Sequence, residues 1–220
     1  MATVERALNV LSSFYTLLFV FCIFVSLAQH VYADDSSSSL VKDSMTGKFL
    51  YFAYGSNLLA QRIHINNPSA VRAGIAKLND YRLDFVGQSS RWKGAPATIV
   101  PHTGKHVWGA LWELDNADKE SLDRQEGVDA NIYFPLEVEV ESSDGKVMRA
   151  RTYRETAEIK EYVDLSKLPA ERQPSTIYLK TILTGAKESG LPSEYQEILK
   201  TICDNGYQGD VDIGKLNLIS

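Results

Sequence analysis

The chain has 220 residues, of which 44% are hydrophobic and 23% are charged, a composition typical of globular proteins. Its formal net charge of -5 and the lack of a basic block in the sequence argue against a nucleic-acid-binding surface. The predicted partners are therefore small molecules.

Residues 1–33 have the pattern of a secretory signal peptide. Arg6 precedes an uncharged apolar run over residues 14–28, and Val31 and Ala33 stand where a signal peptidase selects its site. We expect cleavage after Ala33 and secretion of the remaining chain. The apolar run also approaches the length of a membrane span, so an uncleaved signal anchor is the alternative. In either case the membrane is contacted only through this segment.

A flexible leader is predicted over residues 34–48, because this stretch is polar and contains four consecutive serines. The folded domain is expected over residues 49–220. Cleavage leaves Cys203 as the one cysteine of the mature chain, which excludes an intramolecular disulfide. A domain of this length closes a core without such a cross-link.

The apolar run over residues 49–58 predicts a buried strand that ends in a tight turn at Gly55, Ser56 and Asn57. Glycine and asparagine tolerate unusual backbone angles, so such a turn can direct several backbone N–H groups toward one point. It predicts either an anion or oxyanion pocket or, in the plainer interpretation, a strand followed by a turn.

Further along the chain, strand and helix patterns alternate. A short helix is expected over residues 58–63, two strands over 71–75 and 81–86, and a polar loop that lines a site over 87–94. Next come a hairpin over 97–112, a helix over 115–127, a second hairpin over 133–153, and helices broken at Pro174, Gly190 and Pro192. This order predicts an α+β fold, with a mixed, mostly antiparallel curled sheet or small β-barrel surrounded by helices.

Two histidines, His102 and His106, have the spacing of metal ligands on one helix face. Gly104 between them and the strand patterns on both sides place them on a hairpin instead, so no metal site is predicted. The sequence also shows no nucleophile elbow and no glycine-rich phosphate loop. Neither a metal nor another cofactor is expected.

Among the many acidic residues, Glu126 has a distinctive position at the end of the helix predicted over 115–127. A carboxylate at a helix C-terminus lies in an unfavourable dipole potential, and its pKa rises further if it is also desolvated. A carboxylate of this kind suits proton transfer from an amine, whereas a solvated glutamate at this position has no such role.

Together, five ordered segments between residues 49 and 209 resemble the gamma-glutamylcyclotransferase family. They are YFAYGSNLL at residues 51–59, RIHINNPSA at 62–70, the hairpin at 97–112, SLDRQEGV at 121–128 and GAKESGLPSEYQ at 185–196. The resemblance implies a mixed α/β barrel that cyclises γ-glutamyl amino acids to 5-oxoproline. The predicted signal sequence of this chain is a departure from the familiar members of the family, which are cytosolic.

The resemblance also implies the roles of particular residues. Glu126 is expected as the general acid/base, and Tyr178 as a substrate-binding tyrosine. The binding loop is expected to comprise Tyr51, Phe52, Ala53, Tyr54, Gly55 and Ser56. The implied partners are a small γ-glutamyl peptide and a second copy of the chain in a homodimer. Two alternatives stay open: a glutathione-preferring cyclotransferase, and a secreted binding protein on the same fold without relevant catalysis.

Overall fold

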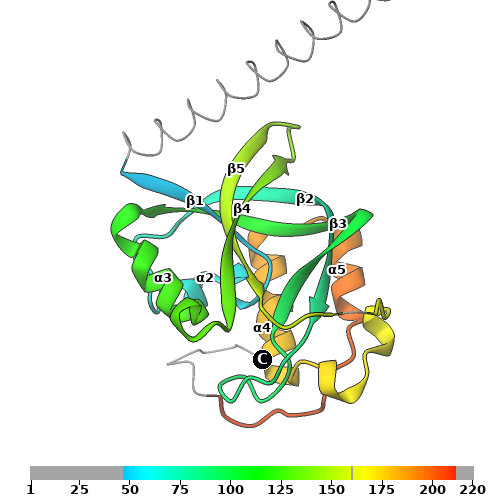
Figure 1. Cartoon of the computed structure of the whole chain (residues 1–220). Helices are drawn as coiled ribbons and strands as arrows, with labels where there is room; N and C mark the ends of the chain where they lie inside the picture. Colours follow the sequence, from blue (N-terminus) through cyan, green and yellow to red (C-terminus); the bar gives the residue numbers. More distant parts are fainter. Residues whose placement is uncertain (1–46, 160, 212–220) are drawn as a thin grey trace, which may run out of the picture. The chain divides into compact units, whose positions relative to one another are not determined.

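Five strands curl into a closed barrel in the described part of the chain (Figure 1). The structure is a computed structural model that describes residues 47–159 and 161–211, so the predicted signal peptide and most of the leader lie outside the described residues. The strands are β1 (Lys48–Ala53), β2 (Val71–Phe85), β3 (Ala97–Asp115), β4 (Tyr133–Ser142) and β5 (Val147–Glu155). Their order is β1-β3-β2-β4-β5, and the barrel closes where β1 pairs with β5 in parallel. All other pairings are antiparallel, which confirms the predicted fold class.

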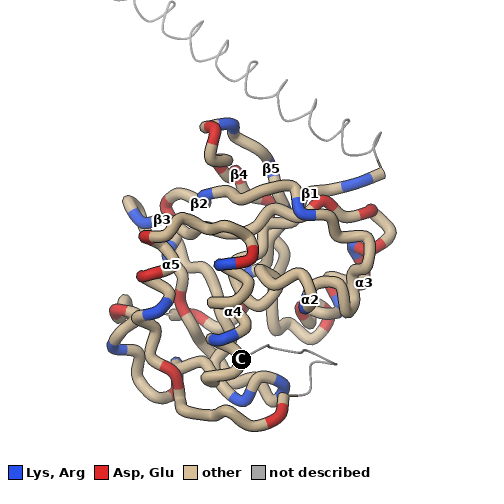
Figure 2. The backbone as a smooth tube through the Cα atoms, turned by 180° about the vertical axis from the view of Figure 1, so that it is seen from behind, with Lys and Arg blue, Asp and Glu red and all other residues tan. Residues whose placement is uncertain are grey.

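Helices cover the outside of this barrel. The α-helices are α2 (Ala60–Ile63), α3 (Lys119–Glu126), α4 (Thr176–Ser189) and α5 (Ser193–Lys200). The 3-10 helices are η1 (Ser56–Leu58), η2 (Asn116–Asp118), η3 (Val128–Ala130), η4 (Leu165–Lys167) and η5 (Ala170–Arg172). In Figures 1 and 2, α2 and α3 lie side by side, and α4 packs against η1. Among the described residues, no helix is both long and apolar enough to cross a membrane.

Local capping chemistry sets the ends of the two helices that matter most for the site. Gly127 adopts φ of 69°, a left-handed conformation that stops α3 directly after Glu126, as predicted from the sequence. Ser175 caps α4, because its side chain accepts a hydrogen bond from the backbone N–H of Tyr178 at 3.2 Å. Both predicted site residues therefore lie at helix termini.

The sequence prediction was wrong about β2 and β3. The two strands expected over 71–75 and 81–86 form one strand, and the expected hairpin over 97–112 also forms one strand, which pairs with β2. Residues 102–105 bulge out opposite Asp80, which has φ of 60° and accepts a hydrogen bond from the Gly104 N–H at 2.8 Å. Pro101 and Gly104 therefore mark a bulge that bends a long strand, not a reversal of the chain.

The core lies inside the barrel and under α4. Its largest fully buried side chains include Trp112, Phe52 and Phe85. At Gly109, a Cβ atom would lie 2.5 Å from the Ala53 carbonyl oxygen and 2.7 Å from the Phe52 ring, so only glycine lets β1 pass this closely. Charged residues of both signs are interspersed on the elements around the core (Figure 2).

Candidate active site

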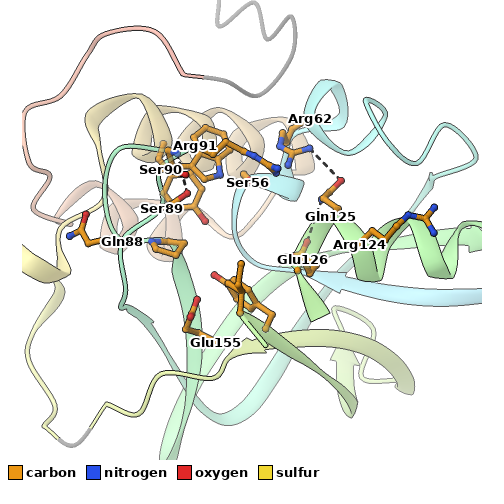
Figure 3. A pocket seen from close by; sticks show the side chains of 16 residues that line it. Ser56, Arg62, Gln88, Ser89, Ser90, Arg91, Arg124, Gln125, Glu126 and Glu155 are labelled. Carbon is orange, nitrogen blue, oxygen red and sulfur yellow. Dashed lines mark hydrogen bonds between the residues drawn. The ribbon is translucent and has the colours of Figure 1, made fainter. Parts of the chain in front are cut away.

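A cavity of about 320 Å³ lies between the turn after β1, the C-terminal end of α3 and the loop over residues 87–94 (Figure 3). A smaller cavity of about 40 Å³ shares Ser56, Glu126, Tyr133 and Tyr178 with it. The small cavity is also lined by Tyr51, Tyr54, Gly55, Asn57, Ala97 and Tyr153. Most of the predicted site residues therefore converge, but neither cavity is lined by Phe52 or Ala53, which are buried in the core.

Glu126 is held at the junction of the two cavities. Its Oε1 atom accepts hydrogen bonds from Asn57 Nδ2 at 3.1 Å and from Gln125 Nε2 at 3.3 Å. Burial raises the pKa of Glu126, while the positive charges of Arg62 and Arg91 and the two hydrogen bonds oppose the rise. The carboxylate is thus fixed in place and is a stronger base than an exposed glutamate.

Gln125 contacts Glu126 directly and also contacts Asn57, the other hydrogen-bond partner of this carboxylate. Its Oε1 atom accepts hydrogen bonds from Arg62 Nη1 at 3.4 Å, Asn66 Nδ2 at 3.2 Å and Asn67 Nδ2 at 3.3 Å. Because the oxygen faces these three donors, the Gln125 amide nitrogen faces Asn57 Oδ1, at 3.2 Å. The loop after α2 therefore fixes the direction of a donor in the site.

Asn57 connects the turn after β1 to the acid. Besides contacting Glu126, its Nδ2 atom donates to the Tyr51 hydroxyl at 3.0 Å. Its carbonyl oxygen accepts a hydrogen bond from the buried Trp112 Nε1 at 3.0 Å. The turn is therefore anchored to β3 at the residue that positions Glu126.

The hydroxyl of Tyr178 lies against the same turn. It accepts a hydrogen bond from the Ala97 N–H at 3.1 Å. Burial raises the pKa of Tyr178 to about 12, with hydrogen bonds from the backbones of Ala97 and Ser56 opposing the rise, so the hydroxyl stays protonated. A Cβ atom on Gly55 would lie 3.1 Å from this oxygen, and glycine permits the approach. With both N–H groups directed at its oxygen, Tyr178 can donate its own proton to a ligand.

Two arginines bring positive charge to the larger cavity. Arg62 is 3% exposed, and its Nε atom is buried without a hydrogen-bond partner. Arg91 lies beside Arg62 (Figure 3), close enough to lower its pKa along with burial, which is the larger effect. Within the described part of the chain, neither arginine forms an ion pair. Arg62 is buried and Arg91 is exposed, and cations without an ion-pair partner suit the carboxylates of a ligand.

A second carboxylate lines the larger cavity at the end of β5. Glu155 is 8% exposed, and its Oε2 atom is buried without a hydrogen-bond partner. Burial raises the pKa of Glu155 to about 7, and the Tyr133 hydroxyl opposes the rise. The sequence prediction ended this strand at Tyr153 and therefore missed Glu155.

The two histidines that have the sequence spacing of metal ligands lie away from these cavities. His102 and His106 are both on β3, and neither lines the two cavities. Across residues 47–159 and 161–211, no group of three or more His, Cys, Asp or Glu residues has a geometry that would hold a metal ion.

Comparisons with known proteins show similarity over most of the chain. The model of the AIG2-like family matches residues 106–199. Gamma-glutamylcyclotransferases of Bos taurus and Homo sapiens are each 46% identical over 167 residues, which cover 74% of this chain and 83% of the relative. A solved structure of a gamma-glutamyl cyclotransferase is 43% identical, with a TM-score of 0.68, and the match covers 75% of this chain and 94% of that one.

Proposed function

The chain belongs to the gamma-glutamylcyclotransferase family, and we propose on this basis that it converts γ-glutamyl amino acids to 5-oxoproline and a free amino acid. One observation carries the proposal. A partly buried carboxylate, Glu126, is held by Asn57 and Gln125 in the cavity that also contains the Ser56 turn and the Tyr178 hydroxyl. This arrangement places a base opposite a hydrogen-bond donor, as ring closure onto a carbonyl requires.

Glu126 starts the reaction as a general base. The α-amino group of the substrate is mostly protonated at neutral pH, and the Glu126 carboxylate takes one proton from it. The freed nitrogen attacks the γ-carbonyl carbon of the same molecule, and a C–N bond forms. Closure of a five-membered ring needs little additional ordering once the cavity holds the γ-glutamyl chain in a folded conformation.

Tyr178 and Glu126 complete the reaction. As the nitrogen attacks, negative charge develops on the γ-carbonyl oxygen, and the Tyr178 hydroxyl donates a hydrogen bond to it. The tetrahedral intermediate then collapses, and the original amide C–N bond breaks as protonated Glu126 gives its proton to the leaving nitrogen. Glu126 then takes the second proton from the ring nitrogen and passes it to the freed amine, which leaves as an ammonium group. The products are 5-oxoproline and a free amino acid, and the enzyme regains its starting protonation state.

The arginines favour substrates with two carboxylates. Arg62 lies near Glu126, as its effect on the Glu126 pKa shows, and the α-carboxylate of the γ-glutamyl group is bonded to the carbon that carries the reacting amine. Arg91 is more exposed and lies on the loop over residues 87–94, where it can bind the carboxylate of the leaving amino acid. This arrangement supports γ-glutamyl amino acids as substrates.

The test is an assay of 5-oxoproline release from γ-glutamyl-alanine by the purified chain, with glutathione compared side by side. Replacing Glu126→Gln should lower turnover by at least about a hundredfold, because a general acid/base contributes this much or more. Glu120→Gln is the matched control, since Glu120 lies on the same helix with its side chain 90% exposed. A folded protein without turnover, or undiminished turnover by the Glu126 variant, contradicts the proposal.

We also propose that residues 1–33 direct export and are removed. The support is the sequence pattern of Arg6, the apolar run and the small residues Val31 and Ala33. N-terminal sequencing of protein from the culture medium should find Asp34 first. A chain that begins before residue 14, or that stays in the membrane fraction, contradicts this proposal. Light scattering of the same material tests the predicted homodimer.

A further inference from the structure

The proposed reaction leaves one buried charge of the larger cavity without a role. Glu155 lines this cavity and is 8% exposed, yet its Oε2 atom has no hydrogen-bond partner. Its backbone N–H is satisfied by Thr98 Oγ1 at 3.1 Å, so the strand itself is well formed at this residue. A carboxylate oxygen left unpaired in a buried position costs stability, and a ligand that supplies a donor removes that cost.

The position of Glu155 relates it to the leaving group. Glu126 and Tyr178 line both cavities, whereas Glu155 lines only the larger one, together with Gln88 and Arg91 of the loop over residues 87–94. The small cavity of about 40 Å³ holds neither half of a substrate whose breaking bond lies beside Glu126, so both halves extend into the larger cavity, the γ-glutamyl α-carboxylate toward Arg62. The leaving residue then extends into the larger cavity, toward Glu155.

The charges of the cavity suggest what this residue is. In Figure 3, Arg62 and Arg91 lie together on one side of the cavity, and Glu155 lies on the other side. No lysine or arginine of the described residues forms an ion pair with Glu155. The two arginines match two substrate carboxylates and Glu126 matches the reacting amine, which leaves one negative charge for a further cation.

We infer that Glu155 selects γ-glutamyl amino acids whose leaving residue has a positively charged side chain, such as lysine. The inference rests on the proposed function, because it assigns the larger cavity to the leaving residue. A carboxylate within a desolvated cavity discriminates strongly between a charged and a neutral group of similar size, since the ammonium alone forms a charge-assisted hydrogen bond. Glu155 is thus a specificity-determining residue.

The experiment compares γ-glutamyl-lysine with γ-glutamyl-norleucine, which lacks the terminal ammonium group. The unaltered chain should show a kcat/KM at least about tenfold higher for the lysine peptide, and Glu155→Gln should lower this ratio at least about tenfold. Glu158→Gln, an exposed glutamate three residues further along that does not line the cavity, should keep the ratio. Equal kcat/KM values for the two peptides with the unaltered chain overturn the inference, as does a ratio that Glu155→Gln leaves unchanged.

Calorimetric binding of the same two peptides separates this inference from the proposed function. If neither peptide is consumed, but the lysine peptide binds at least about tenfold more tightly and Glu155→Gln abolishes the difference, the proposed reaction fails and the role of Glu155 stands. If both peptides are consumed and they bind equally, the reaction stands and the inference fails. Because equal binding of the two peptides by the unaltered chain overturns the inference by itself, the inference can be refuted even if the variant does not fold.

Discussion

Replacing Glu155→Gln should stabilise the fold, and only above the pH at which Glu155 loses its proton in the unfolded chain. The folded-state pKa of Glu155 is raised from 4.5 to about 7, because the carboxylate is buried. Between these pH values the unfolded chain loses its proton while the folded chain keeps it, so the free energy of unfolding falls as the pH rises. Below pH 4.5 both states are protonated and the group contributes nothing. Above pH 7 the loss of stability is complete.

The magnitude follows from the size of the pKa change. Each pKa unit corresponds to about 1.4 kcal/mol, so a change from 4.5 to about 7 destabilises the folded chain by about 3 kcal/mol above pH 7. The glutamine side chain resembles the protonated acid in size and polarity and has no charge. The variant and the unaltered chain should therefore have similar stabilities near pH 4.5, and the variant should be more stable at pH 8.

Thermal unfolding at a series of pH values measures this difference. A domain of this size gains about 2–4 °C in Tm for each kcal/mol, so the variant should unfold about 6–12 °C above the unaltered chain at pH 8. The other titrating groups are shared by both proteins, so the change of the Tm difference with pH isolates Glu155. Glu158→Gln, at an exposed position, should show no such change. A Tm difference that stays constant between pH 4.5 and pH 8 refutes the reasoning, because Glu155 is then not a destabilised buried acid.

Two further predictions concern the reaction. Tyr178→Phe should lower kcat about a hundredfold with little change in KM, because the hydroxyl donates to charge that develops only in the transition state; a variant defective mainly in KM contradicts this role. In the pH profile of kcat/KM for γ-glutamyl-alanine, the acidic limb should lie above pH 4.5, because burial raises the pKa of Glu126 and the base must be ionised to act. An acidic limb at or below pH 4.5 shows that another group controls it.

The sequence predicted those parts of the fold that local chemistry determines. The hairpin of β4 and β5 was found because residues 142–145 combine polar turn formers with Gly145, which adopts φ of 82°. The continuity of β2 and β3 was not found, because Pro101, Gly104 and Asp80 have the local character of strand breakers. Only the pairing of β2 with β3 shows that these residues form a bulge, and that pairing joins residues from 12 positions apart, Phe85 with Ala97, to 42 positions apart, Val71 with Glu113.

The candidate site was predictable where a residue has a distinctive place in its own element. Glu126 was found because Gly127 ends its helix, and Tyr178 only because the chain resembles a known family. Arg62 and Glu155 were missed, and Asn57 was predicted only as part of the turn and not as a partner of Glu126, since each is an ordinary residue of a helix, a strand or a turn in its local sequence. Their importance comes from burial without a partner or from contacts with distant residues, which a single sequence does not show.

The turn at Gly55 and Ser56 shows how the structure changes a prediction without removing it. The sequence indicated that backbone N–H groups of this turn could face an oxyanion directly. In the structure, the Tyr178 hydroxyl occupies the space beside Gly55 and receives hydrogen bonds from the backbones of Ala97 and Ser56. These bonds polarise the hydroxyl and make it a better donor. In the proposed reaction the backbone of the turn therefore acts on the substrate through Tyr178, and the absence of a side chain at Gly55 gives the tyrosine the room to do so.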